Sequence, residues 1–167
     1  MDSKSQPDNE RILQLVGAIV LTCQDTERYL KLTLPFLSSD DDSLGAALRR
    51  HEKLKRRTLG ELVGNLTDSS SSDSLDFAKY LEQLVNTRNQ IVHHFNETYE
   101  VMIASGGQKE VIASLESQLT NLRGLRATTE QLALFVLEGL RDVTFRNTPE
   151  YDQMAALCAT FRQRVAS

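Results

Sequence analysis

The sequence predicts an all-α fold, an up-and-down bundle of about four to five helices, and three observations support this prediction. Glycine and proline are few, at 8 and 3 of 167 residues. Leucine and alanine dominate the apolar residues, a balance that favours helices over strands. Apolar residues also recur at helical spacing in several long segments. The length is sufficient for a single domain over residues 1–167 with a buried core.

The first helix is predicted over residues 9–37, after a polar tail at residues 1–8. Its apolar residues recur at helical spacing, and the pattern ends near Pro35. An acidic loop, SSDDDS, follows. Its three consecutive aspartates, Asp40, Asp41 and Asp42, cannot converge on a cation without other ligands, so no metal is expected. Residues 44–57 then form a short helix or an ordered connector.

A capping box from Thr58 to Glu61 predicts the start of a brief second helix. The serine-rich stretch at residues 67–74 has no apolar residue to bury and is predicted to be a flexible loop. Asp73 or Ser74 at its end would cap the third helix, which continues through residues 84–96.

Two adjacent glycines, Gly106 and Gly107, end the third helical segment. A long helix is then predicted from Gln108 to Arg141, with a bend or interruption at Gly124. Its buried side is expected to carry Val111, Leu115, Leu119, Leu122, Leu132, Phe135, Val136 and Leu140. The last helix should begin at Thr148, with Pro149 in its first turn. It should direct Met154, Leu157, Cys158 and Phe161 inward.

Composition excludes several classes of protein. A net charge of −4 argues against coating nucleic acid through the overall field, although a local basic patch is still possible. The N-terminus lacks the pattern of a signal peptide, and no apolar run is long enough to span a bilayer, so a soluble cytoplasmic protein is expected. Cys23 and Cys158 have neither metal-ligand nor redox-motif spacing and are interpreted as ordinary thiols.

An arginine lies on the apolar face of the helix that contains LVNTRNQIVHHFN, residues 84–96. At about 100° per residue, Leu81 and Val92 fall within about 40° of Arg88. A guanidinium cannot lose its charge, so burying it is costly unless it meets an anion or reaches solvent along its own stem. Internal carboxylates that could serve are Asp25, Glu27 and Glu82. The other interpretation is that Arg88 grips an external phosphate with its planar fork.

Two histidines follow Arg88 within two turns. By the same helical geometry, Asn89 and His93 share one flank of the apolar face, and His94 falls on the other. Histidine titrates near neutrality, so an imidazole near a phosphate-binding arginine could transfer protons in phosphodiester chemistry.

The run from Arg88-Asn89 to His93-His94, framed by Leu81, Leu84, Val85, Val92 and Phe95, resembles the signature of the HEPN superfamily. The resemblance covers about residues 77–96. It implies a bundle of about four to five helices and, in active members, a metal-independent endoribonuclease without cofactors. It also implies a site composed at a homodimer interface, which would explain why Arg88 lies on an apolar face.

On this resemblance, His93 would act as base or acid in the cleavage of RNA to a 2′,3′-cyclic phosphate. Arg88 would stabilise charge on the phosphorane, and Asn89 would orient the histidine or the phosphate. His94 also fits the spacing of the family, and His93 is preferred because it shares a flank with Asn89. The implied setting is toxin-antitoxin or anti-phage defence, with an antitoxin, a nucleotidyltransferase or another defence protein as partner.

Two further points stay open at this stage. The dense basic stretch of Arg49, Arg50, Lys53, Lys55, Arg56 and Arg57 is either an RNA-guiding surface or a solvated helix face that balances the nearby aspartates. The alternative to an enzyme is a non-catalytic helical adaptor that binds a partner protein through the same apolar face.

Overall fold

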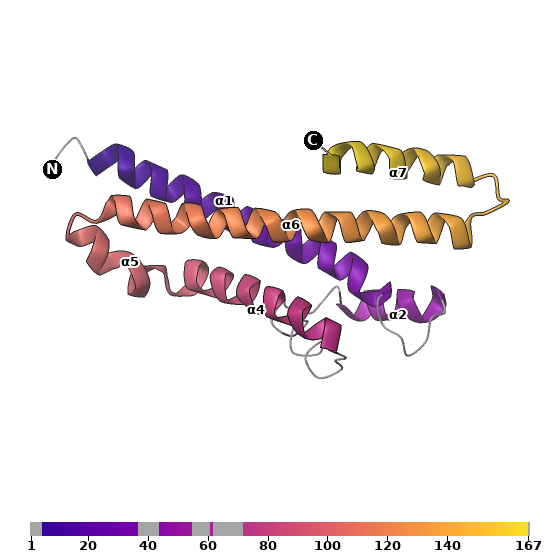
Figure 1. The fold of residues 1–167 in the computed structure, drawn as a ribbon, viewed down its shortest axis with the longest axis horizontal. Coiled ribbons are helices and arrows are strands. Elements are labelled where there is room, and N and C mark those ends of the chain that lie inside the picture. The colour runs from indigo at the N-terminus through magenta and orange to yellow at the C-terminus, as the bar shows by residue number, and fades with distance from the viewer. Residues whose placement is uncertain (1–4, 37–43, 55–60, 62–71, 167) are drawn as a thin grey trace. The chain divides into compact units, whose positions relative to one another are not determined.

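The computed structural model describes residues 5–36, 44–54, 61 and 72–166, and every regular element in this part of the chain is a helix. Figure 1 shows these elements in chain order. They are α1 (Ser5–Thr33), the 3-10 helix η1 (Leu34–Phe36), α2 (Leu44–Leu54), α4 (Ser72–His93), α5 (Phe95–Ala104), α6 (Gln108–Thr144) and α7 (Tyr151–Ala166). The all-α fold predicted from the sequence is confirmed.

The chain divides into two compact units. Unit 1 comprises Met1–Asp25 and Arg57–Leu125, and unit 2 comprises Thr26–Arg56 and Arg126–Ser167. Both α1 and α6 run through this division, so each contributes residues to both units. The helix that carries Arg88 belongs to unit 1. The single domain expected over residues 1–167 stays a prediction.

Unit 1 buries one apolar face from each of its helices. The faces follow the spacing of three and four residues that a helix requires to keep side chains on one side. The buried residues are Ile12, Leu15, Ile19 and Cys23 of α1, Leu81, Leu84 and Ile91 of α4, Tyr99 of α5, and Val111, Leu115, Leu119 and Leu122 of α6. The buried side predicted for the first half of α6 is therefore confirmed.

Several predicted boundaries differ from the structure. The first helix begins at Ser5, so residues 5–8 of the expected polar tail are helical. The helix α4 begins at Ser72, so the last three residues of the expected loop at 67–74 are helical too. Asp73 and Ser74, predicted at the N-cap position, consequently lie inside α4. The remainder of that loop, Thr58 of the predicted capping box and the three aspartates lie outside the described residues.

The turn between α5 and α6 explains the paired glycines. The amide of Gly106 donates to the carbonyl of Ile103 at 3.1 Å, and that of Gly107 donates to the carbonyl of Met102 at 2.8 Å. This is the hydrogen-bond pattern of a Schellman cap, whose left-handed residue is Gly106 at φ 87°. A side chain on Gly107 would meet Met102 at 2.8 Å. Both positions therefore require glycine, and the predicted break is confirmed.

In unit 2, the second half of α6 runs alongside α7 (Figure 1). Two residues predicted to face inward here are exposed, since Phe135 is 72% and Leu157 is 62% accessible. Cys158 is buried as predicted. The helix α6 continues through Gly124 to Thr144, without the interruption considered for that position.

The last helix begins later than predicted. Asn147 has a positive φ of 67°, and the amide of Tyr151 donates to the carbonyl of Thr148 at 3.2 Å. The turn thus occupies residues 145–150, and α7 begins at Tyr151. Pro149 lies in this turn, before the helix, where its missing amide costs no helical hydrogen bond.

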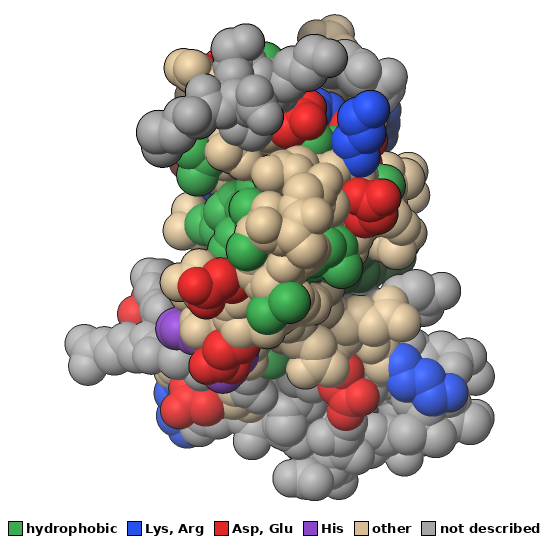
Figure 2. All heavy atoms as spheres, turned by 90° about the vertical axis from the view of Figure 1, so that its left-hand side faces the viewer, with side chains coloured by type: hydrophobic (Ala, Val, Ile, Leu, Met, Phe, Trp, Pro, Cys, Tyr) green, Lys and Arg blue, Asp and Glu red, His purple; other side chains and the backbone are tan. Residues whose placement is uncertain are grey.

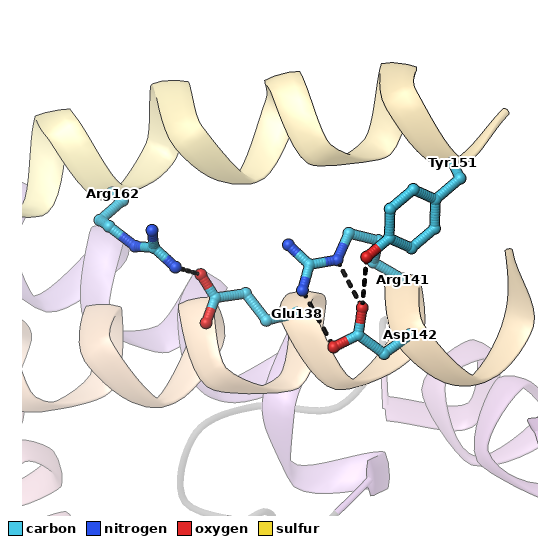
Figure 3. A network of polar contacts seen from close by, with 5 residues as sticks. All are labelled: Glu138, Arg141, Asp142, Tyr151 and Arg162. Carbon is cyan, nitrogen blue, oxygen red and sulfur yellow. Dashed lines mark hydrogen bonds and ion pairs between the residues drawn. The ribbon is translucent and has the colours of Figure 1, made fainter. Parts of the chain in front are cut away.

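A polar network joins α6 to α7 (Figure 3). Arg141 donates two hydrogen bonds to the carboxylate of Asp142, at 2.7 and 2.9 Å. The hydroxyl of Tyr151 donates a third at 3.1 Å, and Arg162 of α7 pairs with Glu138 one turn earlier on α6. The bonds from Arg141 and Tyr151 hold the pKa of the Asp142 carboxyl below its ordinary value of 3.8, against the opposing effect of desolvation.

Truncating Leu115 should destabilise the protein far more than truncating Leu157. Leu115 is fully buried, so Leu115→Ala should cost about 2–5 kcal/mol of unfolding free energy through lost burial and a cavity. Leu157→Ala, at an exposed position of another helix, should change it by less than about 0.5 kcal/mol. Urea denaturation followed by circular dichroism measures both. Equal losses would mean that the burial pattern is wrong.

Asp142→Asn should destabilise the protein at neutral pH and not in strong acid. Because the pKa of Asp142 is lower in the folded state, its contribution is complete above the ordinary value of 3.8 and is lost as pH falls through the folded value. The difference in unfolding free energy between wild type and variant should therefore shrink below about pH 4. Gln153→Ala, at an exposed position of α7, is the control, because removing an uncharged side chain should change the unfolding free energy equally at all pH values. A difference in unfolding free energy between wild type and Asp142→Asn that is constant with pH would contradict the role given to this network.

Candidate functional site

Arg88 lies at the edge of the buried face of α4. Leu84 and Ile91, one turn before and one turn after it, are buried, whereas Arg88 itself is half-buried. Val92, expected on the same apolar face, is 46% exposed. The buried arc is thus displaced toward Leu84 and Ile91. Arg88 marks the border between core and surface and does not occupy the middle of the stripe, as the sequence pattern had indicated.

The charge of Arg88 has no partner within the part of the chain that the structure describes. Of the carboxylates considered as partners, Glu27 pairs with Lys31 at 2.8 Å and Glu82 is exposed to solvent. A half-buried guanidinium without an anion keeps part of its desolvation cost. It also keeps its hydrogen-bond donors for an external group.

The helix that carries Arg88 is interrupted six residues later. His94 has φ −124° and ψ 21°, values outside the helical region, and separates α4 from α5. Its carbonyl accepts from both the amide and the hydroxyl of Thr98, at 3.0 and 2.8 Å. Threonines in α1, α6 and α7 make the same bond without breaking their helices, so this bond alone does not explain the interruption. The continuous helical geometry assumed through residue 95 therefore ends at His93.

Both histidines are exposed at this interruption. Their ring centroids lie 6.4 Å apart in an edge-to-face arrangement. The Nδ1 atom of His94 lies 2.8 Å from a carboxylate oxygen of Glu97. Because a carboxylate accepts, Nδ1 carries the proton, and Nε2 of His94 is the atom left to exchange one.

Glu97 is the residue that the sequence analysis did not identify. The sequence did contain a signal for this pairing, because His94 and Glu97 are three residues apart, a spacing that brings side chains together on a helix. An imidazole oriented by a carboxylate is the arrangement used for general acid-base catalysis. Of the two histidines, only His94 has this partner within the described structure, whereas His93 shares a helix flank with Asn89, which is half-buried.

One copy of the chain does not direct the predicted residues to a common point. Arg88 and His93 are five residues apart on α4, which places them about 140° apart around the helix axis. The two side chains therefore leave α4 in different directions. The predicted residues are close in sequence and share one region of unit 1, but one copy of α4 does not direct them to a single point.

Exposed hydrophobic side chains surround this region. Val92 on α4, with Val101 and Met102 on α5, reaches the surface, and Val101 is 83% exposed. Figure 2 shows carboxylates lying among exposed hydrophobic side chains on one face of the molecule. On α5 the side opposite the buried Tyr99 carries both kinds, Val101 and Glu97. Contiguous exposed apolar patches are typical of interaction surfaces, whereas scattered single apolar side chains are not.

The basic stretch is only partly described. Arg50 is half-buried and donates to the carbonyl of Pro35 at 2.8 Å, a bond that holds α2 to η1. Arg49 and Lys53 are exposed on α2. Lys55, Arg56 and Arg57 lie outside the described residues. Arg50 thus has a structural role, and an RNA-guiding role for Arg49 and Lys53 stays a prediction.

The described residues contain no group of three or more histidine, cysteine or acidic side chains that could hold a metal ion. Cys23 and Cys158 are both buried free thiols. Among the described helices, none combines the length and apolarity that crossing a membrane would demand.

Comparison of the chain with protein-family models, with curated proteins and with solved structures gave no match. The interpretation of the site therefore depends on the chemistry of its residues and on the motif around Arg88.

Proposed function

We propose that this chain is a HEPN-like, metal-independent endoribonuclease whose site forms between two copies, with a role in toxin-antitoxin or anti-phage defence. The observation that carries the proposal is the state of Arg88. It is half-buried beside the core of unit 1 and has no anionic partner among the described residues. A phosphate bound by the guanidinium fork would offset the desolvation cost of this half-buried charge, because charge-assisted bidentate pairs are the strongest hydrogen bonds available to a guanidinium.

The histidines at the end of α4 supply the proton transfers. One imidazole takes the proton of the ribose 2′-hydroxyl, and that oxygen attacks the neighbouring phosphorus. The bond to the 5′-oxygen breaks, and a second imidazole gives the leaving oxygen its proton. The products are a 2′,3′-cyclic phosphate and a 5′-hydroxyl, so no metal and no cofactor is required. His93 remains the first candidate for one of these two proton transfers, as base or as acid. His94, oriented by Glu97, is the candidate for the other transfer.

A two-fold pairing of α4 and α5 would complete the site. Residues of one copy that cannot reach a common phosphate are complemented by those of its partner, because a two-fold interface presents the same patch twice. The exposed Val92, Val101 and Met102 would supply the apolar area for such an interface. Arg88 would then bind the substrate phosphate at the border of that interface.

The exposed apolar side chains also favour a second candidate, a non-catalytic adaptor that binds another protein through α4 and α5. In that case Arg88 is an interface residue and neither histidine is needed. Arg88→Leu should then be tolerated or stabilising, because the substitution removes an unpaired charge from a half-buried position.

Purified protein should cleave single-stranded RNA or transfer RNA in EDTA and leave 2′,3′-cyclic phosphate ends. His93→Ala should reduce the rate by about 10²–10⁴-fold, the usual contribution of a general acid or base. Arg88→Ala should reduce it by about 10²–10³-fold through lost stabilisation of the phosphorane. His94→Ala and Glu97→Gln, measured beside them, separate the roles of the two histidines. Gln83→Ala on α4 and Arg123→Ala on α6, both at exposed positions of unit 1, are the matched controls.

Cleavage that needs a divalent metal would contradict the proposal, and so would equal cleavage by wild type and both histidine variants. Absence of cleavage with all RNA substrates, together with an Arg88→Leu protein that is folded and at least as stable, would favour the adaptor.

A further inference from the structure

Unit 2 contains a cavity of its own, distant in sequence from the histidines of α4. Its volume is about 530 Å³, and its lining comes from η1, α2 and the unit 2 segments of α1, α6 and α7. Pockets that bind small molecules are typically about 300–1,000 Å³. The cavity therefore has room for a small ligand, and one unit supplies the whole lining.

The walls of this cavity are mainly apolar. Leu137 and Leu140 of α6 line it together with Phe161 of α7. Leu32 and Leu48 line it too, and they remain 45% and 51% exposed. Removing such surface from water is favourable, so an apolar molecule that covers these leucines would gain affinity from the contact.

The arginines that line the cavity already have partners. Arg164 donates a hydrogen bond to the hydroxyl of Tyr29 at 2.5 Å, and its guanidinium lies 4.6 Å from the ring centroid of Phe161. The guanidinium of Arg28 lies 5.3 Å from the ring centroid of Tyr29, and both arginines have further interactions. None of the described lining residues is acidic. The cavity therefore offers an ionic ligand neither an open positive charge nor a carboxylate.

His51 carries a polar atom that is left for a ligand. Its Nδ1 atom lies 3.0 Å from the carbonyl oxygen of Lys31, which can only accept, so Nδ1 carries the proton. The second ring nitrogen of the neutral imidazole, Nε2, is then an acceptor, and it has no partner within the described part of the chain. The hydroxyl of Thr33, by contrast, donates to the carbonyl of Tyr29 at 3.0 Å. A hydroxyl group on a ligand would therefore find its acceptor at His51.

We propose that this cavity binds a small uncharged apolar molecule that carries one hydroxyl group. The apolar body lies against Leu48, Leu137 and Phe161, and the hydroxyl donates to Nε2 of His51. An ionic ligand would lose its hydration without meeting an unpaired counter-charge, which is costly. This proposal is independent of the proposed ribonuclease, because all lining residues belong to unit 2.

Isothermal titration calorimetry on the full chain at neutral pH tests the chemistry of the ligand with three probes that share a propylphenyl body. They are para-propylphenol, para-propylanisole, whose methyl ether cannot donate, and para-propylbenzoate, which is anionic. The phenol should bind with a stoichiometry of one. The ether should bind about two- to tenfold more weakly through the loss of one hydrogen bond, and the benzoate at least about tenfold more weakly. An ether or a benzoate that binds as tightly as the phenol overturns the proposal, as does a phenol that does not bind.

Variants locate the binding in this cavity. His51→Asn offers an amide donor to the carbonyl of Lys31 and lacks an acceptor at the position of Nε2, so it should remove the difference in affinity between the phenol and the ether. A His51→Asn protein that still prefers the phenol would overturn the hydrogen bond to His51.

Leu48→Glu should weaken the phenol at least about tenfold by placing a charge in the apolar wall. Leu21→Glu is its matched control, since Leu21 is 65% exposed on α1 and does not line the cavity. If Leu48→Glu and Leu21→Glu leave the same affinity while circular dichroism shows both folded, the phenol does not bind in this cavity.

Discussion

Burial of one apolar face on each of α1 and α6 is the interaction on which the rest of the fold depends. Both helices run through the two compact units, so each unit is built on a segment of each. The buried faces include polar residues, and local bonds satisfy them. Thr33 donates to the carbonyl of Tyr29, and Thr129 donates to that of Arg126. Small hydroxyls bonded along their own helix let the apolar face continue without leaving these hydroxyls unsatisfied.

Helical spacing predicted the elements of unit 1 well because their buried faces are long and regular. The same spacing failed at Phe135 and Leu157, since periodicity defines an apolar face but not whether another element covers all of it. The break at His94 had no sequence signal, because neither glycine nor proline is present there. It is seen in the backbone of His94, at φ −124° and ψ 21°, a conformation visible only in coordinates.

The candidate site was predicted in part. The position of Arg88 on an apolar face identified it, because a guanidinium at such a position needs an explanation. The pairing of His94 with Glu97 depends on where α5 begins, so it required the structure. The cavity of unit 2 was not predictable, because its lining comes from five elements that no local pattern connects.

The function proposed here depends on a second copy that completes the site around Arg88. The most direct test is the mass in solution, by light scattering, of the wild-type chain and of Val92→Glu, which places a charge on the exposed apolar part of α4. The account predicts about twice 18.8 kDa for the wild type and a folded monomer for the variant. A wild-type chain that stays monomeric at high concentration would contradict the account, as would a dimer unaffected by the glutamate.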